Sequence, residues 1–189
     1  MHRPFAQVDV FTIVPYRGNP VAVVLDGARL GDDEMQRFAN WTNLSETTFV
    51  LPPSDRGADY RVRIFTPSGE LPFAGHPTLG TCHAWLEAGG SPNVPDRIVQ
   101  QCAVGLVPLR RDAGQLAFAA PPLIRSGPVD EPMIEQIAEL LEVEREDIVE
   151  AAWVDNGPGW VAVLLRDADA VLAVPCRCPP DVSLSLIHI

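Results

Sequence analysis

Residues 43–80, NLSETTFVLPPSDRGADYRVRIFTPSGELPFAGHPTLG, decide how this chain folds. They contain a β-branched and apolar run, ETTFVL, which begins at Glu46, then a turn rich in proline and glycine, and then a returning run, YRVRIF. β-Branched and aromatic residues favour strands, and a period of two puts Arg61 and Arg63 on one face of the second strand. This stretch therefore predicts two neighbouring strands, the second of which has a solvated arginine face.

The end of the same stretch predicts a helix over residues 77–87. Proline is well suited to the first helical position, which makes His76 the predicted N-cap. The helix carries almost no charge before Glu87 and is apolar on most sides, so it belongs inside the molecule. Gly80 would let it pass close to a strand. Backbone N–H groups at its start can bind an anion beside the imidazole.

The remaining pattern predicts a mixture of strands and helices, which is an α+β fold. Further strands are predicted at residues 6–11, 21–25, 98–102, 105–109, 115–119, 151–154 and 160–165, and further helices at residues 31–43, 130–141 and 167–172. We place a boundary after the two prolines at positions 121 and 122, because a new helical pattern begins beyond them. Residues 1–122 are then a first lobe, residues 128–175 begin a second, incomplete lobe, and residues 176–189 are a non-native or irregular tail.

Composition excludes several classes of function. The chain has 189 residues, a net charge of −11 and no lysine, which argues against nucleic acid or an anionic membrane surface as its partner. The four cysteines have no zinc-like spacing, so no metal site is expected. No long apolar segment or signal sequence is present, and we expect a soluble, cytoplasmic protein.

Two residues, Glu46 and His76, occupy positions where the predicted secondary structure does not require a titratable side chain. Glu46 opens an apolar strand, and by position it is either a solvent-facing carboxylate at the strand end or a functional group. His76 is either a helix cap or core imidazole, or part of a site. Ser45 and Asn19 have the same two interpretations, a role in a turn or a contact with a substrate.

Five segments together resemble the signature of the phenazine-biosynthesis PhzF family. They are residues 8–12 (VDVFT), 18–24 (GNPVAVV), 43–49 (NLSETTF), 65–67 (FTP) and 70–80 (ELPFAGHPTLG). The resemblance implies a diaminopimelate-epimerase-like fold, in which each of two lobes wraps a mixed sheet around a central helix and the active site lies in the cleft between the lobes. It also implies a homodimer for the full-length family.

The resemblance also implies an activity. The glutamate that matches Glu46 acts as general acid and base and moves a proton between carbons of a small cyclic or amino carboxylic acid without a cofactor. The histidine that matches His76 lies in the same cleft. We expect Asn19, Ser45, Gly75, Pro77 and Thr78 to contact the carboxylate substrate. A racemase with two catalytic thiols is rejected, because Cys82 lies too deep in its helix.

Two alternatives to an active isomerase stay open. One is a noncatalytic small-molecule-binding protein of the same fold, and the other is an inactive fragment. The family's second lobe continues well beyond residue 189, and residues 184–189 resemble a translated sequencing adaptor. We therefore expect this chain, as written, to lack turnover. The sequence does not name the substrate.

Overall fold

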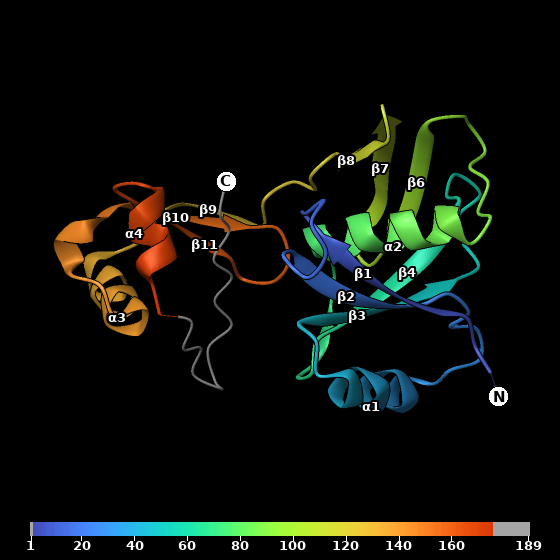
Figure 1. Ribbon diagram of the computed structural model, residues 1–189, viewed down its shortest axis with the longest axis horizontal. Coiled ribbons are helices and arrows are strands. Elements are labelled where there is room, and N and C mark those ends of the chain that lie inside the picture. Colours follow the sequence, from blue (N-terminus) through green and yellow to red (C-terminus); the bar gives the residue numbers. More distant parts are fainter. Residues whose placement is uncertain (1, 176–189) are drawn as a thin grey trace. The chain divides into compact units, whose positions relative to one another are not determined.

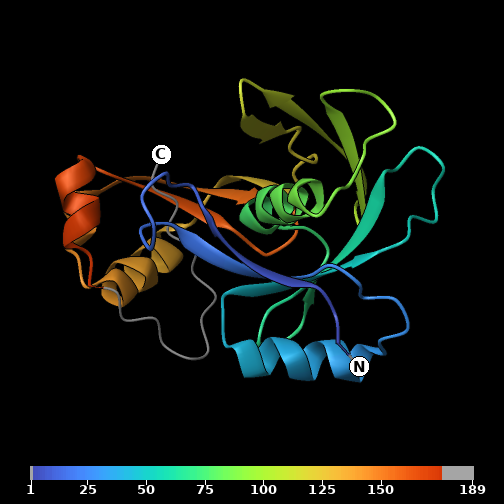
Figure 2. The same cartoon turned by 45° about the vertical axis from the view of Figure 1, so that its right-hand side comes forward.

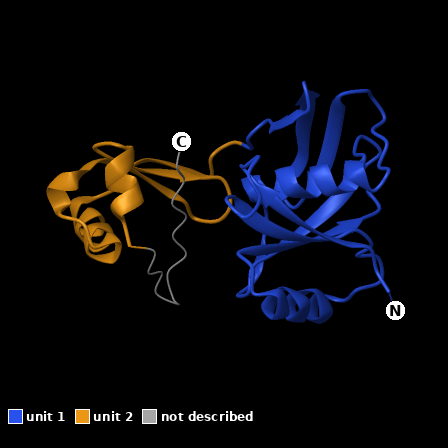
Figure 3. Cartoon of the chain, in the orientation of Figure 1, with its two compact units in different colours: residues 1–121 blue, residues 122–189 orange. Residues whose placement is uncertain are grey.

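The structure is a computed structural model that describes residues 2–175. The chain divides into two compact units, Met1–Pro121 and Pro122–Ile189, coloured blue and orange in Figure 3. The predicted irregular tail, residues 176–189, lies outside the described residues. The interpretation of the units as a first lobe and an incomplete second lobe stays a prediction.

Unit 1 is built on one mixed sheet of eight strands, with β1 to β4 and β6 to β8 in sequence order and β5 paired to β4. The pairs β2–β3 and β4–β6 are parallel and the others antiparallel. The strands are β1 (Phe5–Val10), β2 (Asn19–Val24), β3 (Glu46–Leu51), β4 (Tyr60–Phe65), β5 (Glu70–Leu71), β6 (Arg97–Cys102), β7 (Gly105–Asp112) and β8 (Gln115–Phe118). This confirms the predicted α+β class.

Helix α2 (Gly75–Glu87) lies inside the curl of this sheet, as predicted (Figures 1 and 2). Successive residues of a helix are about 100° apart around its axis, so neighbouring residues face different directions. Because the sheet bends around α2, each direction meets a different strand. Gly80 approaches Val21 of β2, whereas Thr81 contacts Thr48 of β3 and Thr78 contacts Gln100 of β6.

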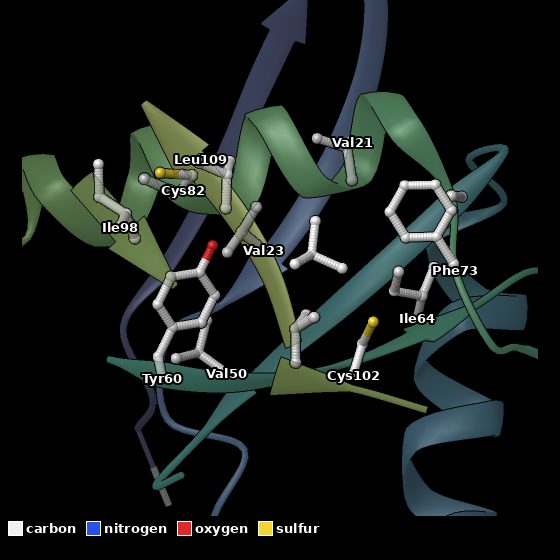
Figure 4. Packing of buried hydrophobic residues seen from close by; sticks show 14 of the residues in the cluster. Val21, Val23, Val50, Tyr60, Ile64, Phe73, Cys82, Ile98, Cys102 and Leu109 are labelled. Carbon is white, nitrogen blue, oxygen red and sulfur yellow. The ribbon is translucent and has the colours of Figure 1, made fainter. Parts of the chain in front are cut away.

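The main core fills the space between α2 and the strands. Figure 4 shows Val23, Tyr60 and Ile64 in this space, and all three are almost completely buried. A Cβ atom on Gly80 would come within 2.4 Å of Cγ1 of Val21. The absence of a side chain at Gly80 is therefore what allows α2 to approach β2 this closely.

Helix α1 (Asp32–Thr42) covers the other face of β3 and β4. It is amphipathic, and its buried residues Met35 and Ala39 pack with Phe49 in a second, smaller cluster. It begins where the Glu34 carboxylate accepts a hydrogen bond from the Gly31 N–H, and it ends at Asn43 in a left-handed conformation. Its predicted bounds are confirmed.

Unit 2 packs helices against one side of a three-stranded antiparallel sheet with β10 in the centre. Its elements are β9 (Arg125–Pro128), α3 (Glu131–Leu141), a short 3₁₀ helix (Arg145–Asp147), β10 (Ile148–Asp155), β11 (Val161–Leu165) and α4 (Ala168–Ala173). The sequence pattern missed β9, whose residues Arg-Ser-Gly-Pro have no strand propensity. No helix in the described part of the chain is long and apolar enough to cross a membrane.

Candidate active site

Glu46 is the first residue of β3, and it points to the α2 side of the sheet. It pairs with Val21 of the parallel strand β2, and its side chain is only 9% exposed. The Oε2 atom has no hydrogen-bond partner among the described residues. The interpretation of Glu46 as a solvent-facing strand end is therefore wrong, because β2 and α2 cover its carboxyl group.

His76 lies in the first turn of α2, two residues further into the helix than predicted. The helix starts at Gly75 and its N-cap is Ala74, so His76 is not the cap. The hydroxyl of Thr78 donates to the Ala74 carbonyl, which extends the hydrogen-bonded helix back beyond Pro77. Pro77 is tolerated at the third helical position because an N–H group there has no partner within the helix.

The two side chains face each other although thirty residues separate them in sequence. Nε2 of His76 lies 3.3 Å from Oε2 of Glu46, and each side chain is 9% exposed. The contact lacks hydrogen-bond alignment, and both atoms are buried without a hydrogen-bond partner within residues 2–175. Unpartnered buried polar atoms are costly and rare, so two of them facing each other mark a site where another molecule could bind.

Burial moves the pKa values of the two groups in opposite directions. It raises the pKa of Glu46 from 4.5 to about 7, because a carboxylate loses its hydration there. It lowers the pKa of His76 from 6.5 to about 4, a shift that the backbone of Pro20 partly opposes. At neutral pH the imidazole is therefore uncharged, while the carboxyl group exists in both of its protonation states.

Asn19 is the first residue of β2, and its side chain adjoins the pair. Its Nδ2 atom is 3.4 Å from Nδ1 of His76, on the opposite side of the ring from Glu46. The structure thus brings together Asn19, Glu46 and His76 from three separate elements. Ser45 precedes Glu46 and is exposed to solvent.

The other predicted contacts belong to the first turn of α2. Gly75 and His76 have N–H groups with no partner inside the helix. A Cβ atom on Gly75 would come within 3.0 Å of the Phe118 ring. Pro77 and Thr78 are buried, and both the N–H and the hydroxyl of Thr78 donate to the Ala74 carbonyl. The side chain of Thr78 therefore holds the turn together rather than facing outward.

One neighbour of the site was not predicted. The ring of Phe11 lies 6.4 Å from the imidazole of His76, between ring centroids, and Phe11 is 72% exposed. It begins the loop between β1 and β2, where Ile13 and Tyr16 are also almost fully exposed. The sequence signal was available, because four large apolar residues, Phe11, Ile13, Val14 and Tyr16, lie in a segment punctuated by proline and glycine.

The local geometry suits proton exchange. A carboxyl group with a pKa near 7 can both accept and donate a proton at neutral pH. The neutral imidazole beside it adds no competing positive charge, and the start of α2 directs N–H groups outward. In residues 2–175, no group of three or more histidine, cysteine, aspartate or glutamate side chains is placed to hold a metal ion.

Comparisons with known proteins agree with the motifs in this site. Antisense-enhancing sequence 1 of Schizosaccharomyces pombe is 41% identical over 176 residues, which cover 89% of this chain and 59% of that protein. Trans-2,3-dihydro-3-hydroxyanthranilate isomerase of Pseudomonas aeruginosa is 48% identical over 118 residues, which cover 61% of this chain and 40% of that protein. The chain thus spans less than two thirds of the length of these relatives.

Solved structures lead to the same group of proteins. The PhzF-family phenazine biosynthesis protein of Bacillus anthracis superposes with a TM-score of 0.65 at 28% identity, covering 88% of this chain and 56% of that one. The family of phenazine biosynthesis-like proteins matches residues 8–184, a range that includes Asn19, Glu46 and His76. By sequence match and by fold, this chain belongs to the PhzC/PhzF family of phenazine biosynthesis-like proteins.

Proposed function

We propose that this protein is an isomerase that moves a proton between two carbon atoms of a small cyclic or amino carboxylic acid. Glu46 is the general acid and base, and no cofactor takes part. The observation that carries the proposal is the buried pair of Glu46 and His76, in which two unpartnered polar atoms face each other at 3.3 Å. The isomerase names of three relatives support the same class of reaction.

Each step of this reaction balances without an oxidant or a reductant. The Glu46 carboxylate takes a proton from a carbon atom, and the electrons of the broken C–H bond move into the conjugated system of the substrate. The protonated carboxyl group then gives a proton to a second carbon atom. The carboxylate is restored, and the substrate and product are isomers. A pKa of about 7 lets Glu46 perform both halves near neutral pH.

The neighbouring residues bind and orient the substrate. The N–H groups of Gly75 and His76 bind the substrate carboxylate at the start of α2, where the helix dipole favours negative charge. Pro77 and Thr78 shape this turn. His76 stabilises charge that develops during proton transfer, while Asn19 orients the imidazole. Ser45 hydrogen-bonds either the substrate or Glu46.

The family resemblance also bears on the compartment, the partners and the assembly of the protein. We propose a soluble, cytoplasmic protein whose partner is the small-molecule substrate, and a homodimer as the assembly. The net charge of −11 makes nucleic acid and membrane surfaces unfavourable partners.

The test follows proton exchange directly. A version of the protein continued to the length of its relatives, which this chain spans only in part, is incubated in D₂O with trans-2,3-dihydro-3-hydroxyanthranilate, the compound in the relatives' names, and deuterium at carbon is followed by NMR. Glu46→Gln should lower the exchange rate by about 10²-fold or more while substrate binding persists, since an amide cannot exchange a proton. Glu87→Gln is the control, because Glu87 is an exposed residue at the far end of α2.

Two results would overturn the proposal. Unchanged exchange in Glu46→Gln would remove Glu46 from the chemistry. Tight binding of the compound by the extended wild-type protein without any exchange would instead identify a noncatalytic binding protein of this fold, whereas exchange in the extended protein but not in this chain would identify the chain as an inactive fragment.

A further inference from the structure

The apolar side chains of helix α2 do not by themselves fix its rotation or its position along its axis. The sheet surrounds it, and most of its residues are apolar, including the buried Cys82 and Ala84. Apolar contacts have little direction, so a helix that is apolar on most sides can turn or slide with small changes in buried area. The position of His76, however, depends on one rotation of this helix.

Directional contacts therefore matter for α2, and two of them are buried. The hydroxyl of Thr81 donates to the hydroxyl of Thr48 at 2.8 Å, and Thr48 is also within 3.3 Å of the Ala22 carbonyl, to which it donates. One turn earlier in α2, the amide of Gln100 in β6 donates to the hydroxyl of Thr78 at 3.0 Å. Thr48, Thr78, Thr81 and Gln100 are each 0% exposed. Hydrogen bonds lose strength within tens of degrees of misalignment, so they select one rotation.

The contact with Thr48 is the one that touches the strand of Glu46. Thr48 is two residues after Glu46 on the same face of β3, a rise of about 6.6 Å. Thr81 is five residues after His76 in α2, a rise of about 7.5 Å. The two rises nearly match. The Thr81–Thr48 contact and the His76–Glu46 contact therefore form two successive rungs between α2 and β3.

The two rungs lie at different angles around the helix. Thr81 is about 140° from His76 around the axis of α2, by helical geometry. A turn of α2 would therefore shift His76 and Thr81 in different directions relative to β3. Fixing Thr81 against Thr48 consequently fixes both the rotation and the axial position of His76.

We propose that Thr48 and Thr81 are positioning residues, whose hydrogen bond sets the approach of His76 to Glu46. They do not touch the reacting atoms. A valine pair of similar shape would fill the same space without a buried hydroxyl, so packing alone does not require threonine here. The proposal rests on the proposed function for its catalytic consequence but not for its geometric one.

The chain supplies a matched control on the opposite face of the same strand. Thr47 is also 0% exposed, and its hydroxyl lies 2.8 Å from the hydroxyl of Thr42 at the end of α1. Thr47→Val and Thr81→Val therefore each remove the hydroxyl of a fully buried threonine that pairs β3 with a helix, and the partner of Thr47, Thr42, is itself partly buried. Only Thr81→Val removes a contact that holds α2.

The experiment compares Thr81→Val, Thr81→Ser and Thr47→Val in the full chain. The pKa values of Glu46 and His76 are measured by NMR titration, and unfolding by urea is recorded for each variant. In Thr81→Val we expect the pKa of Glu46 to fall and that of His76 to rise, each by about one unit, because water reaches groups that have moved apart. Exchange should fall by about tenfold or more, since small misplacements are costly.

The other two variants identify the cause. Thr81→Ser keeps the hydroxyl, so both pKa values should stay at the wild-type values. Thr47→Val should also leave both pKa values unchanged, even if it lowers the urea midpoint as much as Thr81→Val does. Unmoved pKa values in Thr81→Val, or equal movement in Thr47→Val, would overturn the proposal. The titrations need no turnover, so a wild-type protein without exchange would remove the isomerase function and leave this test intact.

Discussion

On one face of β3, Thr47 shares a hydrogen bond with Thr42 of α1; on the other face, Thr48 shares one with Thr81 of α2. The two contacts have the same chemistry and the same length of 2.8 Å, and the β3 threonine of each is fully buried. They differ in what lies beside them. Thr47 is followed on its face by Phe49, which lies in an aromatic cluster, whereas Thr48 is preceded on its face by Glu46.

This difference shows that the buried titratable side chains lie on only one face of β3. The α1 face buries apolar and aromatic side chains, and its charged groups, such as Arg63, are paired near the surface. The α2 face buries two titratable side chains that face each other without a hydrogen bond. A single buried carboxyl group costs more free energy than several exposed ion pairs return. The α2 face also holds the main core, but it carries the buried carboxyl group that reduces stability.

Removing the most deeply buried aromatic ring on the α1 face should have the largest effect on stability. Phe49 is 0% exposed and packs edge-on against Phe38 and Phe65. Phe49→Ala should lower the free energy of unfolding by about 3–5 kcal/mol, because it leaves a cavity. Urea unfolding measures this loss, and Phe49→Leu should show a smaller one. The pKa of Glu46, followed by NMR in Phe49→Leu, should not move. A large movement would break the separation of the two faces.

Replacing the buried carboxyl group should instead raise stability above neutral pH. The pKa of Glu46 is raised from 4.5 to about 7 on folding, so below pH 4.5 the group is protonated in both states and burial carries no ionisation cost. Between pH 4.5 and 7 Glu46 ionises in the unfolded chain but stays protonated in the folded protein, so the free energy of unfolding falls as the pH rises. Above pH 7 the cost is complete, roughly 3 kcal/mol. Glu46→Gln should therefore gain up to that amount at pH 8 and almost nothing at pH 4. Urea unfolding at both values checks it, and an equal change at both would contradict it.

The close approach of α2 to β2 can be tested by adding a side chain at Gly80. Glycine to alanine in a helix normally stabilises by about 1 kcal/mol. At Gly80 the new Cβ would meet Val21 at 2.4 Å and Val10 at 3.0 Å, so overpacking should reverse the sign and destabilise by about 1–2 kcal/mol. Arg37→Ala on the exposed side of α1 is the control and should change stability by less than about 0.5 kcal/mol. Thermal unfolding of the two variants compares them.

The smallest effect is expected from the charges on the α1 face. Arg63 Nη1 lies 2.6 Å from Oδ1 of Asp32, whose side chain is 82% exposed, and Nη2 also contacts Glu70. Asp32→Asn should lower the free energy of unfolding by less than about 1 kcal/mol, and high salt should reduce the difference, because an exposed pair is screened. A loss of several kcal/mol, measured by urea unfolding, would show that this face also depends on charge.

Much of the architecture was predictable from local pattern. The bounds of α1, the common face of Arg61 and Arg63 in β4 and the close approach at Gly80 follow from periodicity, turn residues and the absence of a side chain. The prediction that this arginine face is solvated was wrong for Arg63, whose side chain is 18% exposed and lies beside α1, where it pairs with Asp32. Each of these features depends on residues that are near in sequence. The N-cap of α2 was predicted wrongly, because the backbone N–H of Thr78 donates to the Ala74 carbonyl, and the Thr78 hydroxyl reinforces this bond, so that the helix begins before Pro77. The strand β9 was missed, because neighbouring strand β10, not its own residues, makes it a strand.

The sequence by itself determined the α+β class, the family motifs and the two residues, Glu46 and His76, that local structure did not require. Only the tertiary structure decided that their side chains meet at 3.3 Å, that Asn19 and Phe11 adjoin them, and that Thr48 and Thr81 stand beside them as a second rung. The physical reason is that periodicity tells which residues are buried, whereas the distance between two buried residues depends on the order of the strands and on the rotation of the helix they surround.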